Sequence, residues 1–341
     1  MTQKEIAKIL GISRATVSLA LRNHPKIKKE TREKVLKLAR MLKYRPNVMA
    51  QNLITGKTLT IGIIQPYPLS PFFVELVGKI HFLLRKKNYV CISIESGLGK
   101  ELNEVLDIFL TRRVDGLICL ISFIDLEKII HIKMENIPGV FYHEDPDLPV
   151  DLVAVDTYKG GTLATEHLIN LGHKKIGFLG KGHNEQTDRR FLGYKHTLLK
   201  NGLGIDERLV IPGYGDFKTG YEGMKKILAL KDRPTAIIAH NDVVAIGAMS
   251  AIHEAKLRIP QDIAIVGFDN IENSKYLSEP LTTIEFSREE IAKKLVEMLF
   301  FRLDKTNGIE YKKFIVEPKL VIRSSCGYFL RERNKSWGKS L

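Results

Sequence analysis

From Leu59 onward, short apolar segments alternate with helical segments, and this alternation limits the possible folds more than any other feature of the chain. It is typical of parallel α/β layers, because parallel strands need a crossover connection that is usually a helix. The apolar segments predict strands at residues 60–64, 90–94, 116–121, 139–142, 152–155, 176–179, 236–240 and 264–268. About 265 residues with eight or more strands favour two doubly wound lobes over one.

Polar and aromatic side chains gather at the carboxyl ends of these predicted strands, where open α/β sheets bind their ligands. They include Phe72, Phe73, Tyr142, His143, Asp156, Arg190, Asn241, Asp242, Phe268 and Asp269. A sugar or a nucleobase offers an apolar face to an aromatic ring and polar groups to Arg, Asn and Asp. The sequence therefore predicts a small-molecule site here. His143 and Asp156 fit caps equally well, and Asp115 and Asp242 are interpreted as structural.

Charge is distributed unevenly along the chain. Residues 1–58 contain 14 lysines and arginines but only three acidic residues, a local charge of +11, whereas the whole chain carries +14. The rest of the chain is therefore nearly neutral, at +3. A short cationic head on a nearly neutral body indicates a module that binds a polyanion, joined to a module with a different task.

The first 22 residues predict two short helices joined by a tight turn. Thr2 and Glu5 have capping-box spacing, Gly11 suits a left-handed helix end, and Ser13 suits the N-cap of the second helix. The predicted apolar faces are Ile6, Ala7, Ile9 and Leu10 in the first helix and Thr16, Val17, Ala20 and Leu21 in the second. This pattern fits a helix-turn-helix unit, although an ordinary helical hairpin would show it too.

A third helix is predicted roughly over residues 29–42, with a buried stripe formed by Val35, Leu38, Ala39 and Leu42. It begins with Lys28 and Lys29, where the helix dipole disfavours cations unless an anion such as phosphate is near. Solvated surface charge is the alternative explanation. Residues 48–54 then form a segment, between Asn47 and Gly56, that is too short for an isolated helix and is expected to fold only when docked.

Composition and motifs exclude several classes of protein. At 44% hydrophobic and 27% charged residues the chain is not disordered. It has neither an apolar run of membrane-spanning length nor a secretion signal, so a cytoplasmic protein is expected. Three distant cysteines predict reduced thiols, and the histidines never show metal-ligand spacing. No catalytic motif appears, so no enzyme, metal or cofactor is predicted.

Four motifs occur together in one order: "EIAKILGISRATVSLAL", "TREKVLKLA", "YRPNVMAQNL" and "TIGII". Jointly they resemble the lactose-repressor family of transcription regulators, and the similarity continues to Arg323. The resemblance implies a recognition helix that begins at Ser13 and enters the major groove, and a hinge helix over residues 48–54 in the minor groove. The implied DNA-binding residues are Ser13, Arg14, Ala15, Thr16, Leu19, Asn47, Ala50 and Leu53.

Within that set, Arg14 is expected to bind guanine through two hydrogen bonds and Ala15 to touch a thymine methyl group. Leu53 is expected to be an apolar wedge that pries a base step apart, with packing under the body as the alternative. Leu19 departs from the polar residue that many family members carry, so the operator sequence is not transferred from them.

The body resembles the family's periplasmic-binding-protein-like effector domain. The resemblance implies effector contacts from Phe72, Phe73, Arg190, Phe217, Asn241 and Asp269. Arg190 would donate paired hydrogen bonds to ligand oxygens, Phe217 would stack on an apolar face, and Asn241 and Asp269 would close the site from the second lobe. A structural ion pair and core packing are the alternatives for the charged and aromatic members.

Two further positions depart from the family pattern. Ser70 stands where Asn is frequent, and Phe286 stands where many members have Gln. Both changes remove hydrogen-bonding capacity near the site or the lobe crossover. An effector with fewer hydroxyl groups, or a different ligand orientation, is therefore one interpretation.

The sequence thus predicts a small all-α helix-turn-helix domain plus an α/β effector domain of two doubly wound parallel-sheet lobes. The predicted boundaries are 1–46 for the DNA-binding domain, 47–58 for the hinge and linker, 59–327 for the two-lobed domain and 328–341 for a basic tail.

The predicted function is a transcriptional regulator, a repressor in our interpretation, controlled by a sugar-like effector. The predicted partners are near-palindromic operator DNA and a second copy of the chain in a homodimer or larger assembly, with no membrane. A solute-binding transport protein and an enzyme with an accessory DNA-binding domain are the alternatives; the cationic head disfavours the first and the missing catalytic motif the second.

Overall fold

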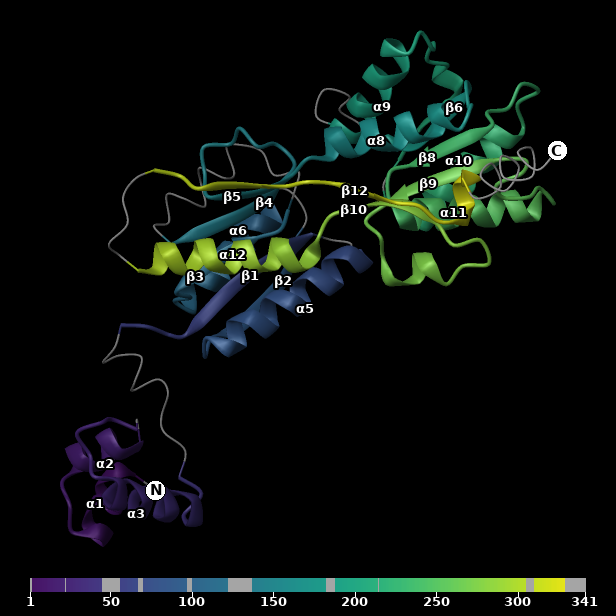
Figure 1. Ribbon diagram of the computed structural model, residues 1–341. Helices are drawn as coiled ribbons and strands as arrows, with labels where there is room; N and C mark the ends of the chain where they lie inside the picture. Colours follow the sequence, from purple (N-terminus) through teal and green to yellow (C-terminus); the bar gives the residue numbers. More distant parts are fainter. Residues whose placement is uncertain are drawn as a thin grey trace, which may run out of the picture. The chain divides into compact units, whose positions relative to one another are not determined.

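The structure is a computed structural model, and it describes residues 2–21, 23–44, 56–66, 70–96, 100–121, 137–181, 188–213, 215–304 and 310–328. The chain divides into two compact units, Met1–Thr58 and Leu59–Leu341, here called the head and the body (Figure 1). Three predicted DNA-contacting residues, Asn47, Ala50 and Leu53, lie outside the described residues, as does the basic stretch 331–339 of the tail.

The head contains three helices, α1 (Gln3–Leu10), α2 (Arg14–Leu21) and α3 (Lys29–Met41). The predicted capping box is confirmed, because the Glu5 amide donates to the Thr2 hydroxyl and the Thr2 amide donates to the Glu5 carboxylate over 2.7 Å. Gly11 ends α1 in the left-handed conformation at φ +63°. The Ser13 hydroxyl accepts a hydrogen bond of 3.0 Å from the Thr16 amide and so caps α2, as predicted.

The head has its own small core. Ile6, Val17, Ala20 and Val35 are fully buried in it, one or two from each helix. The prediction that Ile9 belongs to the buried face of α1 is wrong, since 59% of its surface is exposed. At 100° per residue the buried stripe of so short a helix is narrow, and Ile9 falls outside it.

Lobe 1 of the body is built on a six-stranded sheet in which every pairing is parallel. The strand order is β11-β5-β4-β3-β1-β2. The strands are β1 (Thr60–Pro66), β2 (Val90–Ser96), β3 (Gly116–Cys119), β4 (Gly139–His143), β5 (Leu152–Val155) and β11 (Lys313–Val316). Five of these six strands, β1 to β5, were predicted from their apolar runs. Strands of parallel sheets are usually covered on both faces and therefore tend to be apolar throughout.

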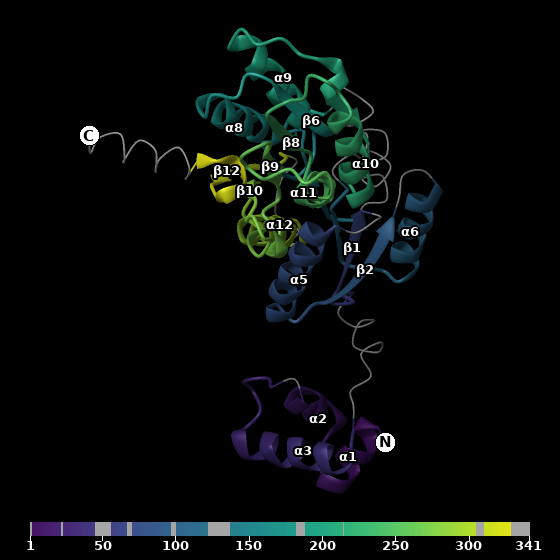
Figure 2. The same cartoon turned by 90° about the vertical axis from the view of Figure 1, so that its right-hand side faces the viewer.

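Helices cover both faces of this sheet. Ile61 and Ile63 of β1 pack with α5 (Pro71–Lys86) and α12 (Arg288–Leu303), whereas Ile64 packs with α6 (Lys100–Thr111). Successive residues of a strand point to opposite faces, so this division follows from the period of two. Figure 2 shows α5 and α12 on one side of β1 and β2 and α6 on the other.

Lobe 2 repeats the arrangement with one difference. Its sheet has the order β12-β10-β9-β8-β6-β7, and only the β10–β12 pair is antiparallel. The strands are β6 (Ile176–Lys181), β7 (Val210–Pro212), β8 (Ala236–Ala239), β9 (Ala264–Phe268), β10 (Thr282–Glu285) and β12 (Lys319–Val321). The helices are α8 (Thr157–Asn170), α9 (Arg189–Lys200), α10 (Phe217–Leu228) and α11 (Asp242–Glu254), with short 3-10 turns at Glu207–Leu209, Glu272–Lys275 and Ser324–Cys326.

Within the described body, the chain passes between the lobes between β5 and α8, between β10 and α12, and between β11 and β12. Phe286 lies at the second of these passages and is 1% exposed, packed beside Gly160 of α8. The predicted fold class, a helical head and two parallel-sheet lobes, is therefore confirmed. Phe286 fills the core at the lobe crossover.

Candidate functional site

Arg190 is the centre of a polar cluster at the boundary between the lobes. It lies in the first turn of α9, where the Asp188 carboxylate caps the helix by accepting from the Phe191 amide over 3.1 Å. Only 8% of Arg190 is exposed, and its Nη1 lies 3.1 Å from Oε1 of Glu144. A guanidinium this deeply buried requires charged partners.

Glu144 connects the two lobes. It directly follows β4 of lobe 1, yet its carboxylate binds two residues of lobe 2. One oxygen pairs with Arg190, and the other accepts a hydrogen bond of 3.1 Å from the Thr157 hydroxyl at the start of α8. Any molecule that competes for Arg190 would therefore also alter a contact between the lobes.

Several buried polar atoms lack a hydrogen-bond partner among the described residues. Two of them, Nε of Arg190 and Nδ1 of His240, belong to the cluster, and Oε1 of Gln65 lies near the carboxyl end of β1; the other three are in Arg32, Arg189 and Glu279. The His240 ring itself binds the cluster, because its Nε2 lies 3.1 Å from Arg190 Nη1. Buried polar groups in native proteins nearly always have partners, so these atoms indicate where a ligand or water binds.

Asp269 contributes a second carboxylate, directly after β9. It is 8% exposed, and burial raises its pKa to about 6, against the opposing effects of Arg190 and Arg288. Arg288, at the start of α12, pairs with Glu75 over 2.9 Å and donates to the backbone carbonyls of Asp269 and Asn270. Arg288 thus links α5 of lobe 1 to the loop after β9 of lobe 2.

Aromatic rings lie beside the charged cluster. Phe72 and Phe73 meet edge to face at 5.2 Å between ring centroids, and Tyr142 lies 5.7 Å from Phe73. The Arg190 guanidinium lies over the ring of Phe268 at 5.5 Å. Burial raises the pKa of Tyr142, so its hydroxyl stays protonated at neutral pH. The cluster therefore combines hydrogen-bonding groups with apolar ring surface, as the sequence predicts for a sugar or nucleobase site.

Two predicted effector contacts lie apart from these interactions. Phe217, the first residue of α10, is 55% exposed, and its backbone packs closely against Gly247. Asn241 caps α11 by accepting from the Val244 amide over 2.8 Å, and its amide nitrogen donates to the Gly215 carbonyl over 3.0 Å. In this structure Asn241 therefore fixes the loop before α10, and its effector contact and that of Phe217 remain predictions.

The carboxylates that the sequence marks as structural or as helix caps accept hydrogen bonds from nearby backbone and side-chain donors. Asp242 accepts from the Thr283 hydroxyl over 2.6 Å and from the Ile271 amide over 2.9 Å, and burial raises its pKa. Asp115 accepts from the Leu59 amide, and Asp156 caps α8. The His143 ring accepts a hydrogen bond from the Asp145 amide.

Sequence reasoning missed Glu144, His240, Gln65 and Arg288. The first three lie at or directly after the carboxyl ends of strands, and this position is the signal that could have identified them. Arg288 carries no local signal, because its partners lie on α5 and after β9.

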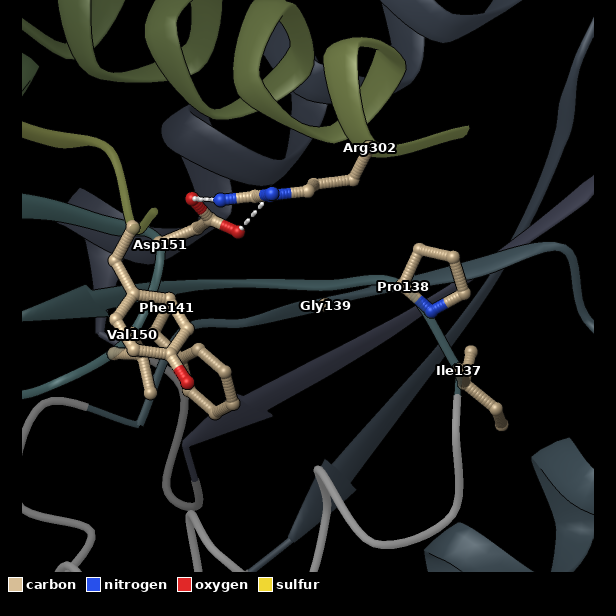
Figure 3. A pocket seen from close by; sticks show the side chains of 8 residues that line it. Ile137, Pro138, Gly139, Phe141, Val150, Asp151 and Arg302 are labelled. Atoms are coloured by element: carbon tan, nitrogen blue, oxygen red, sulfur yellow. Dashed lines mark hydrogen bonds and ion pairs between the residues drawn. The ribbon is translucent and has the colours of Figure 1, made fainter. Parts of the chain in front are cut away.

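A cavity of ≈ 280 Å³ lies at the opposite, amino-terminal edge of the lobe 1 sheet. Figure 3 shows Arg302 of α12 facing Asp151 in a two-pronged ion pair, with Pro138 and Gly139 beside it. The Lys312 amide also donates to Asp151, so this carboxylate holds the start of β11 against α12. None of the predicted effector residues lines this cavity.

In the head, the predicted base-reading residues lie on the surface of α2. Ser13, Arg14 and Ala15 are exposed, and Thr16 and Leu19 are partly exposed, while Val17 and Ala20 anchor the helix in the core. Lys28, at the N-cap of α3, has an exposed side chain that makes no capping hydrogen bond. The first turn of α2 is therefore available for contact with another molecule.

Two kinds of feature are absent from the described residues. No helix there is long and apolar enough to span a membrane. No group of three or more His, Cys, Asp or Glu side chains in the described part of the chain is placed to hold a metal ion.

Two family models match the chain. Residues 2–47 match the model described as "Bacterial regulatory proteins, lacI family", and residues 165–326 match a periplasmic binding protein-like domain. Among curated proteins, the ribose operon repressor of Haemophilus influenzae is 32% identical over 330 residues, which is 95% of this chain and 98% of that protein. The HTH-type transcriptional repressor PurR of the same organism is also 32% identical, with the same coverage.

Solved structures show the same similarity. The lac repressor dimer bound to operator and the anti-inducer ONPF is 26% identical, with a TM-score of 0.86 over 96% of this chain and 99% of that chain. A LacI family regulator from Enterococcus faecium with bound ribose is 28% identical, with a TM-score of 0.70 over 78% of this chain and 98% of that chain.

Proposed function

The chain belongs to the lacI family of bacterial regulatory proteins and is a DNA-binding transcriptional repressor, and from this premise we propose that a small polar molecule bound at Arg190 controls its affinity for operator DNA. The observation that carries the proposal is the Arg190–Glu144 ion pair, which joins the two lobes; beside it, Nε of Arg190 and Nδ1 of His240 are buried and have no hydrogen-bond partner among the described residues. A sugar or sugar derivative fits such a site.

On DNA, two heads of a homodimer bind a near-palindromic operator, because two-fold protein symmetry favours two-fold DNA. Arg14 and Ala15 read base edges in the major groove, while the lysines and arginines of the head contact phosphates. Phosphate contacts release counterions, so operator affinity falls steeply with salt. Leu53 enters the minor groove as a wedge.

The effector acts by shifting a population of lobe arrangements. It changes operator affinity only as far as it binds one arrangement better than the other. Glu144 and Arg288 each contact both lobes, so a ligand at Arg190 acts where the lobes meet. Val74 on α5 and Tyr276 after β9 are exposed apolar side chains, one on each lobe, that a partner subunit of the proposed homodimer would cover.

A thermal shift screen of the full chain tests the proposal. Neutral sugars, sugar phosphates and nucleobases are added singly, and an effector at a hundredfold excess over its Kd should stabilise the protein by about 2.7 kcal/mol. The same compound should change operator affinity, in either direction. Arg190→Ala should lose both responses and bind operator as the wild-type protein does without effector; a full thermal shift in this variant would show that the site is wrong.

We also propose that the protein does not transform its ligand. Its relatives are named as repressors, and no group of three or more His, Cys, Asp or Glu side chains in the described residues is placed to hold a metal ion. Recovery of the hit compound chemically unchanged after incubation supports this, and a converted product contradicts it. No observation favours the transport alternative, since the head matches a regulator model.

A further inference from the structure

His240 lies where β8 ends and α11 begins. Its backbone amide donates to the Leu179 carbonyl over 2.8 Å, which continues the pairing of β8 with β6, and the next residue caps α11. The backbone of His240 is thus fixed on both sides. Its side chain stands at the carboxyl edge of the lobe 2 sheet, in hydrogen-bond contact with Arg190.

The contact with Arg190 determines which ring nitrogen of His240 carries the proton. A guanidinium only donates hydrogen bonds, so His240 Nε2, at 3.1 Å from Arg190 Nη1, must accept. Burial first, and then the charge of Arg190, lower the pKa of His240 to about 4, so the ring is neutral at physiological pH. A neutral imidazole whose Nε2 accepts has its proton on Nδ1.

Nδ1–H of His240 is therefore a buried donor, and it has no partner among the described residues. Nε–H of Arg190 is a second such donor, in the residue to which His240 is bonded. An unpaired buried donor costs free energy, and a ligand atom that accepts its hydrogen bond removes that cost. Two neighbouring unpaired donors indicate a ligand that supplies hydrogen-bond acceptors.

The charges around Arg190 restrict the ligand further. Three described carboxylates, those of Glu144, Asp269 and Asp188, interact electrostatically with this one guanidinium. Arg288, the other cation near Asp269, is already paired with Glu75. An anionic ligand would therefore meet repulsion that a neutral one avoids.

We propose that His240 is a specificity-determining residue of the effector site, and that it donates a hydrogen bond from Nδ1–H to an acceptor atom of an uncharged polar effector. This inference rests on the proposed function of the Arg190 site. It assigns to His240 a role in ligand binding beyond that of holding Arg190, and it predicts that a neutral sugar or nucleobase binds better than its phosphorylated derivative.

Three variants of the full chain separate the two ring nitrogens. His240→Asn places an amide donor near the position of Nδ1, His240→Gln places an amide oxygen near Nε2 to accept from Arg190, and His240→Leu does neither. His173→Leu is the matched control, because His173 lies at the other end of the β6–β8 pair and its Nδ1 is 2.9 Å from the Thr235 hydroxyl.

Without effector, His240→Leu should melt at or above the wild-type temperature, since it removes an unpaired donor while Arg190 Nη1 keeps Glu144 as its acceptor. His173→Leu should melt lower, because it loses a hydrogen bond. A fall of several degrees in His240→Leu would mean that the residue serves the fold, and it would overturn the proposal.

With effector, the probes are D-ribose, other neutral sugars and nucleobases, each beside its phosphorylated derivative. We expect His240→Asn and His173→Leu to keep the wild-type response, and His240→Gln and His240→Leu to bind at least about tenfold more weakly. Equal binding by all variants, or tighter binding of the phosphorylated form, overturns the proposal while leaving the proposed function intact. A panel that fails to stabilise even the wild-type protein contradicts the proposed function itself.

Discussion

Replacement of Asp269 by Asn should make the protein more stable at neutral pH and no more stable at low pH. Asp269 is 8% exposed, and burial raises its pKa from an ordinary value of 3.8 to about 6. Its backbone has φ +96°, in a region where Asn is among the better tolerated residues, so the substitution retains the backbone conformation. The amide resembles the protonated carboxyl group but does not ionise.

The magnitude follows from the two pKa values. A difference between 3.8 and about 6 corresponds to about 3 kcal/mol at 1.36 kcal/mol per pH unit. Because the folded protein holds this proton more tightly than the unfolded chain, the contribution of the proton to stability is complete below pH 3.8 and is lost as pH rises through about 6. Asp269→Asn should therefore gain up to about 3 kcal/mol over wild type at pH 8 but only about 0.6 kcal/mol at pH 4.

Urea unfolding of the full chain, followed by circular dichroism from pH 4 to pH 8, measures this difference. Asp262→Asn is the control, because hydrogen bonds from Arg258 lower the pKa of the partly exposed Asp262 to about 2, so its stabilising contribution is present over the whole range. That control should lose stability almost independently of pH. A flat difference for Asp269→Asn, or a loss at pH 8, would refute the reasoning. Asp269→Asn should also abolish the stabilisation of the protein by its effector.

Three predictions concern the head and the hinge segment. Ser13→Ala removes the cap of α2 and should lower the stability of the head by about 1 kcal/mol, measured by thermal unfolding; no change would mean that the Thr16 amide finds another partner. Arg14→Ala should weaken operator binding by roughly 1–3 kcal/mol and relax preference at one base per half-site, measured with a library of operator variants; uniform weakening would assign Arg14 to phosphate. Leu53→Ala should weaken specific binding far more than nonspecific binding in a gel-shift titration, and equal losses would contradict the wedge.

Local signals in the sequence predicted the head well. The capping box of Thr2 and Glu5, the left-handed Gly11 and the Ser13 cap all depend on residues within four positions of one another, so tertiary contacts change them little. The exposure of Ile9 was not predictable in the same way, because three helices together decide which side of α1 is covered.

The central strands were predicted for a related reason. Strands such as β3, β5, β8 and β9 are buried along their whole length and therefore read as continuous apolar runs. By contrast β7, β10, β11 and β12 were not predicted as strands. Each has only three or four residues, and β11 and β12 carry exposed lysines at edge positions of their sheets, so only pairing with a neighbour reveals them.

The alternation of central strands and helices, the cationic head, the family resemblance and the importance expected of Arg190 and Asp269 could all be read from the residues before the fold was known. The contact of Glu144 in lobe 1 with Arg190, the hydrogen bond that His240 accepts from Arg190, and the burial that raises the pKa of Asp269 depend instead on the folded structure. Helix caps follow from interactions among near neighbours, and fully buried strands follow from their own apolar runs. Protonation states depend on burial and on charges that the fold brings together from distant parts of the chain, and those are absent from any local pattern.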